Sequence, residues 1–254
     1  MIGKLLGKGK TAEVFAWDTD LALKLFYKGH EDDARKEYEN ALCIQNLDIP
    51  VAKCYGKIEA DHRMGILYER MDGSSSLELF LKEKNICGMA KQLAETHKTM
   101  LRCMGTGLPN YKDILQKNIL RAQCIAEGEK QRILKILAEL PSGDRLCHGD
   151  FHPDNLLCSN EGFRVIDFMN VACGHPVLDI ACTVFLLKYV PAEGAEDTLR
   201  DALTTAYIKE MDMDVELLDR SLIVIAAARA GEMQHDEEEC RVAMEYLQSN
   251  FLII

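Results

Sequence analysis

The chain has 254 residues, of which 48% are hydrophobic and 28% are charged. This balance excludes an intrinsically disordered chain and is sufficient for one large domain, or two lobes, with a buried core. Acidic residues outnumber basic ones by 41 to 30, so the formal net charge is −11. A charge of this sign argues against nucleic acid and against anionic membranes as general partners.

Ten cysteines are scattered along the chain, and none of them forms a C-x-x-C pair. This pattern is typical of a reduced protein that uses cysteine as a small apolar residue. The N-terminus has no apolar run of signal-peptide length. The longest apolar run, residues 222–228, is far shorter than the roughly 20 residues that span a bilayer. We therefore expect a cytoplasmic protein without membrane segments, and the sequence carries no signal of its oligomeric state.

Alternating apolar residues and short turns dominate the first part of the chain. Strands are expected at residues 4–6, 13–17, 21–26, 51–58 and 63–71. A charged helix at about 32–47, whose inward positions lie three and four apart, follows the third strand and ends before Pro50. The polar segment 72–76 has the composition of a hinge.

After this segment the hydrophobic period changes from two to about 3.6. Helices are expected at residues 77–83, 88–103, 111–128, 130–140, 195–211, 214–230 and 236–249. Residues 145–176 show little helical period and separate the first four of these helices from the last three. The sequence thus predicts an α+β fold, with a small β-rich N-lobe at residues 1–71, a larger, mostly helical C-lobe at residues 72–254 and a hinge at about 69–73.

The most informative segment, residues 147–157, reads C-H-G-D-F-H-P-D-N-L-L. Phosphoryl transfer from a nucleotide needs a carboxylate beside the attacking hydroxyl, and oxygen ligands that hold Mg²⁺ on the phosphates. A loop of the form H-x-D-x4-N, followed by a strand that ends in Asp, supplies these groups. In this pattern Asp150 is the catalytic base, and Asn155 and Asp167 are the metal ligands.

The N-terminal region contains the other parts that this chemistry needs, in the expected order. Gly7 and Gly9 lie in a turn where backbone N–H groups could approach phosphates, although the third position of the usual glycine pattern is alanine. Lys24 follows on the next strand and would reach the α- and β-phosphates. A glutamate of the following helix would hold this lysine by an ion pair, and helical spacing favours Glu37 over Glu39 for that role.

These motifs resemble those of the aminoglycoside phosphotransferase and choline kinase-like family, which is related to the protein kinases. The resemblance extends over about residues 3–190. It rests on H-G-D-F-H-P-D-N-L-L, I-D-F, G-H-P and L-D-I-A at residues 148–157, 166–168, 174–176 and 178–181.

The resemblance implies a two-lobed, kinase-like fold that binds ATP or GTP with Mg²⁺ in a cleft, with the nucleotide base against the hinge from Glu69 to Met71. It also implies that the hydroxyl of an acceptor meets Asp150, and that Asp179 is a buried carboxylate that braces the catalytic loop. Met169 stands where protein kinases have glycine after Asp-Phe. This departure favours a small-molecule acceptor over a protein.

Three alternatives use the same residues. A Walker A loop would require glycine at position 4, which is Lys4, and a helix after the loop, where the pattern predicts a strand. The H-x-D pair at residues 148–150 with His175 or His235 matches a non-haem iron site, but those sites belong to β-rich folds and this segment is flanked by helical patterns. A kinase-like module without turnover would bind nucleotide only. Such modules have usually lost the lysine, the base or a metal ligand, all of which are present here.

The resemblance also implies that the acceptor lies against the C-terminal helices. Residues 189–254 hold 15 Asp and Glu against 5 Lys and Arg, and so carry nearly all of the excess charge. A cationic acceptor, such as an aminoglycoside, another amino sugar or choline, is favoured if these acids face the cleft, but the helical stripes predict that most face solvent. The expected acceptor contacts are Arg229, Glu232, His235 and Asp236. Arg229 ends an apolar run, so it needs an anionic partner or reads a phosphate or carboxylate.

Overall fold

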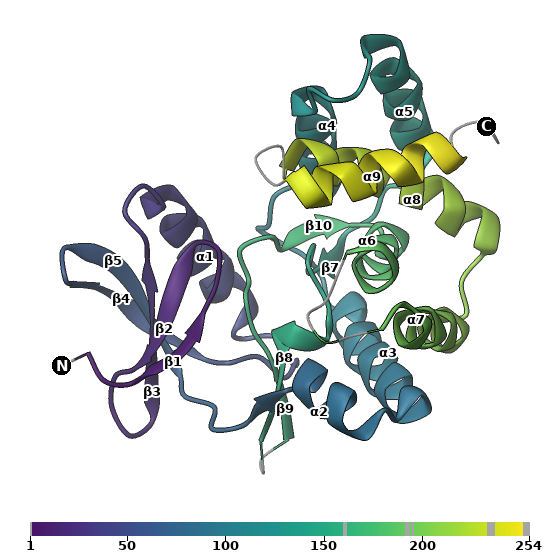
Figure 1. The fold of residues 1–254 in the computed structure, drawn as a ribbon. Coiled ribbons are helices and arrows are strands. Elements are labelled where there is room, and N and C mark those ends of the chain that lie inside the picture. Colours follow the sequence, from purple (N-terminus) through teal and green to yellow (C-terminus); the bar gives the residue numbers. More distant parts are fainter. Residues whose placement is uncertain (1, 160–161, 191–193, 195, 233–236, 251–254) are drawn as a thin grey trace. The chain divides into compact units, whose positions relative to one another are not determined.

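A computed structural model describes residues 2–159, 162–190, 194, 196–232 and 237–250 (Figure 1). The chain forms two compact units. Unit 1 contains residues Met1–Leu79 and Pro153–Val171, and unit 2 contains Phe80–His152 and Ala172–Ile254. Unit 1 thus includes the residues that follow the expected catalytic loop. The lobe boundary at residues 71 and 72 and the hinge at 69–73 stay predictions.

Unit 1 is built on a five-stranded antiparallel sheet. Its strands are β1 (Leu5–Lys8), β2 (Ala12–Ala16), β3 (Leu21–Phe26), β4 (Cys54–Ala60) and β5 (Arg63–Glu69), in the order β1-β2-β3-β5-β4. Helix α1 (Glu31–Ile44) contacts β4 and β5, and its acidic first turn suits the positive end of the helix dipole. Leu23, Leu25 and Ile66 of the strands and Ile44 of the helix are fully buried and form the core.

A small second sheet in unit 1 carries the segment after the catalytic loop. The 3₁₀ turn η1 (Pro153–Asn155) leads into β8 (Leu156–Ser159), which pairs with both β9 (Gly162–Val165) and β6 (Ser74–Ser75). Leu156 pairs with Val165, and the N–H of Ile166 donates to the carbonyl of Asn155. The backbone ladder therefore holds Asn155 and Asp167 close together at the open end of the hairpin.

Helices form most of unit 2 (Figure 1). They are α3 (Ile86–Arg102), α4 (Tyr111–Arg121), α5 (Glu127–Glu139), α6 (Pro176–Tyr189), α7 (Asp197–Met211), α8 (Val215–Glu232) and α9 (Glu237–Asn250). Helix α2 (Ser76–Glu83) runs across the boundary of the units, and the short strands β7 (Arg145–Cys147) and β10 (Ala172–Gly174) pair antiparallel. Helices α6 and α8 contact each other and are buried along most of their length, so they form the core. Helix α7 packs against α3 and α6, and α9 against α8.

The α+β fold class is confirmed. One predicted helix is too long, and one helix of the structure was not predicted. The helix expected over residues 111–128 ends at Arg121, and the next begins at Glu127, because the turn between them places both Ala122 and Ile125 in the core. The sequence does not predict α6, because this helix is apolar on all sides and shows no 3.6-residue period.

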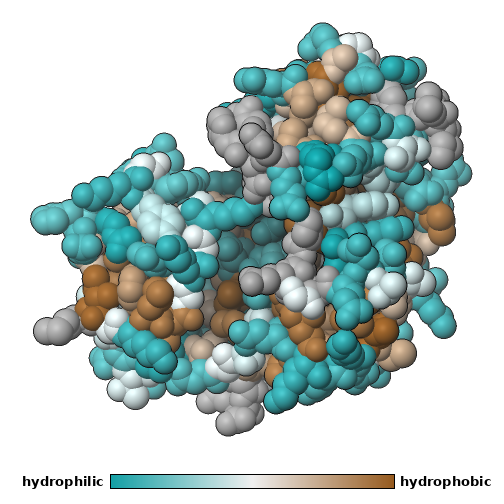
Figure 2. All heavy atoms as spheres, viewed as in Figure 1, coloured by the Kyte–Doolittle hydropathy of each residue, from teal (hydrophilic) through white to brown (hydrophobic). Residues whose placement is uncertain are grey.

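The surface is largely polar. Hydrophilic side chains cover most of the face in Figure 2, and hydrophobic ones lie between them in separate groups. Within the described ranges, no helix is both long enough and apolar enough to cross a membrane.

Candidate active site

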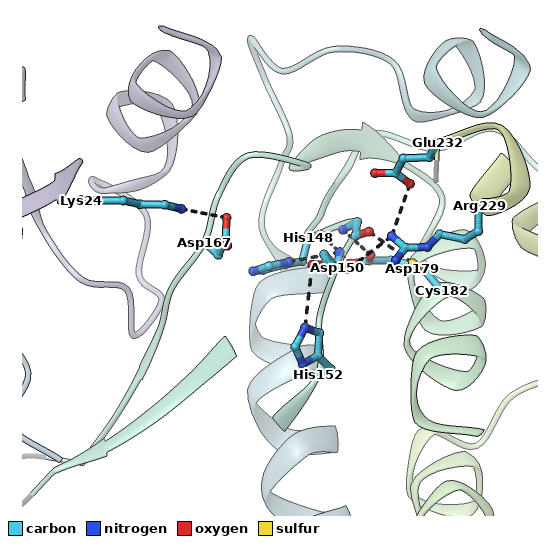
Figure 3. A network of polar contacts seen from close by, with 10 residues as sticks. Lys24, His148, Asp150, His152, Asp167, Asp179, Cys182, Arg229 and Glu232 are labelled. Atoms are coloured by element: carbon cyan, nitrogen blue, oxygen red, sulfur yellow. Dashed lines mark hydrogen bonds and ion pairs between the residues drawn. The ribbon is translucent and has the colours of Figure 1, made fainter. Parts of the chain in front are cut away.

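Lys24, Glu37 and Asp167 form a cluster of ion pairs in unit 1. The Nζ atom of Lys24, on β3, lies 2.7 Å from Glu37 Oε2 on α1 and 3.2 Å from Asp167 Oδ1 (Figure 3). Glu37 is only 1% exposed and accepts a further hydrogen bond of 2.9 Å from the Tyr68 hydroxyl. Burial alone would lower the pKa of Lys24, but the charges of Glu37 and Asp167 raise it above its ordinary value. Lys24 is therefore a fixed cation. Glu37 is the glutamate that holds it, as the helical spacing predicted, whereas Glu39 is exposed.

Asp167 is held in a strained backbone conformation. Its φ angle is +66°, in the left-handed region that non-glycine residues rarely occupy. The side-chain amide of Asn40, on α1, donates to the carbonyl oxygens of Phe168 (2.9 Å) and Met169 (3.2 Å) and so fixes the turn. Surrounding contacts thus impose the strain. They direct a carboxylate that is 37% exposed toward Lys24.

The donor set at this end of the hairpin suits Mg²⁺. Asp167 supplies a carboxylate and Asn155 an amide oxygen, and Mg²⁺ is usually held by one or two carboxylates together with substrate phosphates and water. Among the described residues, no group of three or more His, Cys, Asp or Glu could hold a metal ion. His175 instead caps α6, where its Nδ1 accepts the N–H of Val177 (3.2 Å). It therefore does not complete the iron site that the H-x-D pair allowed.

The glycine turn between β1 and β2 is closed by the Gly9 N–H, which donates to the Ala12 carbonyl (2.9 Å). Gly7 lies in β1, where it pairs with Val14, and not in the turn as expected. It has no positive φ, and a Cβ atom added to it would meet no heavy atom within 4 Å. The fold therefore does not require glycine at position 7. A phosphate that approaches the backbone N–H groups of this segment would require glycine there, because glycine leaves the backbone open to it.

Within the predicted hinge, residues 69–71 are half-buried, whereas Asp72 and Gly73 are exposed. The N–H of Glu69, at the end of β5, donates to the Lys53 carbonyl (2.8 Å), and the Glu69 carboxylate accepts the Lys53 N–H (3.2 Å). The backbone before Met71 is fixed as well, because the Arg70 N–H donates to the Asp20 carbonyl (2.9 Å). Contact of Glu69 and Met71 with a nucleotide base stays a prediction.

In unit 2, Asp179 of α6 holds the backbone of the expected catalytic loop. This carboxylate is fully buried and accepts the backbone N–H groups of His148 (2.6 Å) and Gly149 (2.7 Å). His97 of α3 lies with Nε2 2.9 Å from Asp179 Oδ2 and with Nδ1 2.6 Å from the Tyr207 hydroxyl of α7. The two ring nitrogens of His97 thus connect Asp179 to Tyr207. The burial expected for Asp179 is confirmed, and its carboxylate binds the backbone at residues 148 and 149.

His97 and Tyr207 were not expected at this site. His97 falls on the buried stripe of α3, between Leu93 and Met100, where periodicity marks it as a core position. A polar ring on such a stripe needs a buried partner, and this is the signal that could have drawn attention to it. The partner itself, Asp179, is 82 residues away and is found only in the folded chain.

Arg229 links Asp150 to Glu232 within unit 2 (Figure 3). Its Nη1 atom, near the end of α8, lies 3.5 Å from Asp150 Oδ1 and 3.3 Å from Glu232 Oε2. Asp150 is 26% exposed, and its Oδ2 lies 3.8 Å from His152 Nε2. Burial alone would raise the pKa of Asp150, but His152 and Arg229 hold it well below its ordinary value. Asp150 is therefore ionised at neutral pH and accessible, as a base that receives a proton must be.

The acidic C-terminal stretch faces solvent, as its helical stripes predict. The exposed acids of this stretch are Glu196, Asp197, Asp201, Glu210, Asp212, Asp214, Glu216, Asp219, Glu238 and Glu245. Among the acids described there, Glu232 alone is half-buried, and it is paired with Arg229. The excess charge therefore bears mainly on solubility. Two of the expected acceptor contacts, His235 and Asp236, lie outside the described residues.

Replacing Asp179 by Ala should destabilise unit 2, because two buried N–H groups and His97 lose their acceptor. At pH 7 the free energy of unfolding should fall by about 3 kcal/mol in urea titrations. Burial would raise the pKa of Asp179, but His97 and the Gly149 N–H hold it below the ordinary value of 3.8. Its contribution is therefore complete above pH 3.8 and is lost as the pH falls further.

The difference between wild type and Asp179→Ala should accordingly be constant at neutral pH and shrink below pH 3.8. The exposed Asp201 of α7 offers a matched control, since Asp201→Ala removes the same charge without a buried contact. Equal losses in the two variants would contradict the bracing role.

Comparisons with known proteins identify a family and a shared fold. The model of the APH family, described as the phosphotransferase enzyme family, matches residues 3–214. No curated protein sequence matches the chain significantly.

Several solved structures share the fold. A mutant of aminoglycoside phosphotransferase APH(4)-Ia with AMP-PNP and hygromycin B aligns with a TM-score of 0.69 at 13% identity, over 97% of this chain and 91% of that one. The GDP and kanamycin complex of APH(2")-IIia gives 0.62 at 16% identity, over 98% and 92%. APH(3'')-Id from Streptomyces rimosus with ADP and streptomycin gives 0.57 at 13% identity, over 85% and 90%. The predicted kinase-like fold, with a β-rich N-terminal part and a mostly helical C-terminal part, is confirmed.

Proposed function

This chain belongs to the APH phosphotransferase enzyme family, and we propose that it transfers the terminal phosphoryl group of ATP or GTP, with Mg²⁺, to a hydroxyl of a small polar or cationic molecule. The observation that carries the proposal is the buried Lys24–Glu37 ion pair, with Asp167 3.2 Å from the same lysine nitrogen. Packing of the sheet does not explain these charges, because burying charged side chains costs desolvation free energy. In kinases a lysine held by a glutamate binds phosphates, and a neighbouring aspartate binds the metal.

On the nucleotide side, Lys24 would exchange its contact with Asp167 for oxygens of the α- and β-phosphates. Asp167 and Asn155 would then hold Mg²⁺, which, when bound, neutralises charge on the phosphates. The backbone at Gly7 and Gly9 would approach the same phosphates. The base would lie at the proposed hinge, from Glu69 to Met71.

On the acceptor side, the ionised Asp150 would receive the proton of the acceptor hydroxyl. The hydroxyl oxygen attacks the γ-phosphorus, the bond from that phosphorus to the β–γ bridging oxygen breaks, and the proton passes to the Asp150 carboxylate. Arg229 and Glu232 lie next to this base, so we propose that they bind the polar groups of the acceptor, together with His235 and Asp236.

The class of acceptor follows from the charges around Asp150. Kanamycin, hygromycin B and streptomycin, which are bound in the solved structures above, are cationic. Asp150 and Glu232 would suit such a cation, but Arg229 neutralises part of their charge, and the exposed acids do not add to it. A neutral or zwitterionic hydroxyl compound suits this site as well as a polycation does.

We also propose a cytoplasmic location. All ten cysteines are free thiols, which suits a reducing compartment. The same compartment supplies the nucleotide that the proposed reaction consumes.

The function is tested by a thermal-shift assay followed by a product screen. Millimolar ATP or GTP should raise the melting temperature more with Mg²⁺ than without it. Mass spectrometry should then find a phosphorylated product in a panel of aminoglycosides, amino sugars, choline-like amines and neutral polyols. No shift with either nucleotide would overturn the proposal. A shift without any product would favour the alternative, a kinase-like nucleotide-binding module without turnover.

Two glutamates of α1 offer a matched pair of variants. Glu37→Gln should lower kcat/KM for the nucleotide about 100-fold, because Lys24 loses the charge that holds it on the phosphates. Glu39→Gln removes the same charge from an exposed position and should leave kcat/KM unchanged. Steady-state kinetics at varied nucleotide concentration measures both, and equal effects of the two variants would show that the ion pair does not position Lys24.

A further inference from the structure

Cys124 and Cys240 bring two thiols into contact in unit 2. Their Sγ atoms lie 3.2 Å apart, although the residues are 116 positions apart in the chain. Cys124 lies in the turn between α4 and α5 and is exposed, and Cys240 lies near the start of α9 and is half-buried. An S–S bond is about 2.05 Å long. The two sulfurs therefore need to approach by only about 1 Å to form one.

The elements that carry the thiols also support the end of α8. Gly231 of α8 approaches α4 so closely that an added Cβ atom would lie 1.8 Å from the Asn118 carbonyl oxygen. Arg229 and Glu232 stand on either side of this glycine in the sequence. Helix α9 packs against α8 as well. Helix α4, which leads into the turn of Cys124, and α9, which carries Cys240, are thus two supports of the helix that carries the proposed acceptor residues.

We propose that Cys124 and Cys240 are a reversible redox modification site that forms an intrachain disulfide by exchange with a low-molecular-weight disulfide such as oxidised glutathione. One protein thiolate attacks the glutathione disulfide and releases one reduced glutathione. The second thiolate then attacks the mixed disulfide and releases another. Two S–H bonds of the protein are replaced by one S–S bond, and the glutathione disulfide is reduced to two thiols.

The protonation of Cys124 makes its exchange with disulfides slow. Although the residue is exposed, partial burial of its sulfur and the neighbouring Cys240 thiol raise the pKa of Cys124 to about 11. Cys124 therefore keeps its proton at neutral pH, which slows its attack on a disulfide. The site would respond to a sustained rise in oxidised glutathione rather than to a brief one.

The bridge would connect the α4–α5 turn to α9, two elements of unit 2 that are far apart in the sequence. Closing so long a loop constrains the unfolded chain, so the oxidised protein should be more stable. It would also hold α4 and α9 in place against the last turn of α8, which carries Arg229 and Glu232. Any effect on acceptor binding rests on the proposed function, whereas formation of the disulfide does not.

The test uses the full chain, equilibrated in glutathione buffers of increasing oxidised fraction and then alkylated. Peptide mass spectrometry should find a bridged Cys124–Cys240 peptide and two fewer alkylated thiols, before the exposed Cys43 and Cys87 are modified. The melting temperature should rise by roughly 5 °C, and dithiothreitol should reverse the change.

Serine variants separate this pair from the other thiols. Cys240→Ser should convert the bridge into a mixed glutathione disulfide at Cys124 and remove the rise in melting temperature, whereas Cys87→Ser should oxidise as the wild type does. The peptide map of the wild type decides the matter even where a variant does not fold. The proposal is overturned if the bridge does not form. It is also overturned if the bridge needs as high an oxidised fraction of glutathione as mixed disulfides at Cys43 and Cys87 do.

Discussion

Asp150→Asn should abolish phosphoryl transfer and leave nucleotide binding nearly intact. The amide has the size of the carboxylate and can fill its place beside Arg229, but it cannot accept the proton of the acceptor hydroxyl. We expect kcat to fall about 10³-fold, within the range for loss of a general base. The dissociation constant of the nucleotide should change little, because Lys24, Glu37 and Asp167 belong to unit 1 and Asp150 to unit 2.

This prediction requires two measurements on the same protein. Turnover is followed by mass spectrometry of the product, and the dissociation constant of Mg·ATP or Mg·GTP by calorimetry. Asp201→Asn removes one negative charge from the exposed face of α7 and should keep full activity. Substantial turnover by Asp150→Asn would assign the base to another residue, and a large loss of nucleotide affinity would show that Asp150 supports the nucleotide site as well.

The nucleotide side of the candidate site could be predicted from the sequence because its signals are local. Asn155 and Asp167 are the ends of one hairpin, and Lys24 lies on a strand with clear alternation. Glu37 could be preferred over Glu39 because neighbouring helix positions point in different directions, and the structure buries the first and exposes the second. What these residues bind is still a prediction.

The parts that could not be predicted depend on how helices pack. Asp179 was expected, but His97 and Tyr207, which come from two other helices, meet it only when unit 2 folds. The apolar neighbours of Arg229 in the sequence indicate that it needs an anionic partner. Which partners it has, Asp150 and Glu232, depends on where α8 ends in the folded chain. Helix α6 escaped prediction for a related reason, since burial on all sides removes the amphipathic pattern by which a helix is found in a sequence.

Replacing Asp167 should have the second large effect, and the choice of substitute separates its two roles. Asp167→Asn keeps a residue type that tolerates the left-handed conformation at φ +66° but removes the carboxylate. Without that charge the Mg²⁺ site loses its anionic ligand. We expect kcat/KM to fall about 10³-fold, and the extra stabilisation by Mg²⁺ with nucleotide to disappear, while the melting temperature of the free protein stays close to that of the wild type.

Asp167→Ala removes the same carboxylate but also leaves the left-handed position without a polar side chain, which is what makes aspartate and asparagine tolerate this conformation. Activity should fall as far as in Asp167→Asn, but the free protein should also lose about 1 kcal/mol of stability. Urea unfolding of the two variants measures this difference, because both lack the contact with Lys24 and differ chiefly in backbone strain. If Asp167→Asn still binds nucleotide in a Mg²⁺-dependent way, the metal role is wrong. If the two variants have equal free energies of unfolding, the left-handed backbone at residue 167, which the contacts of Asn40 hold, does not cost the protein stability.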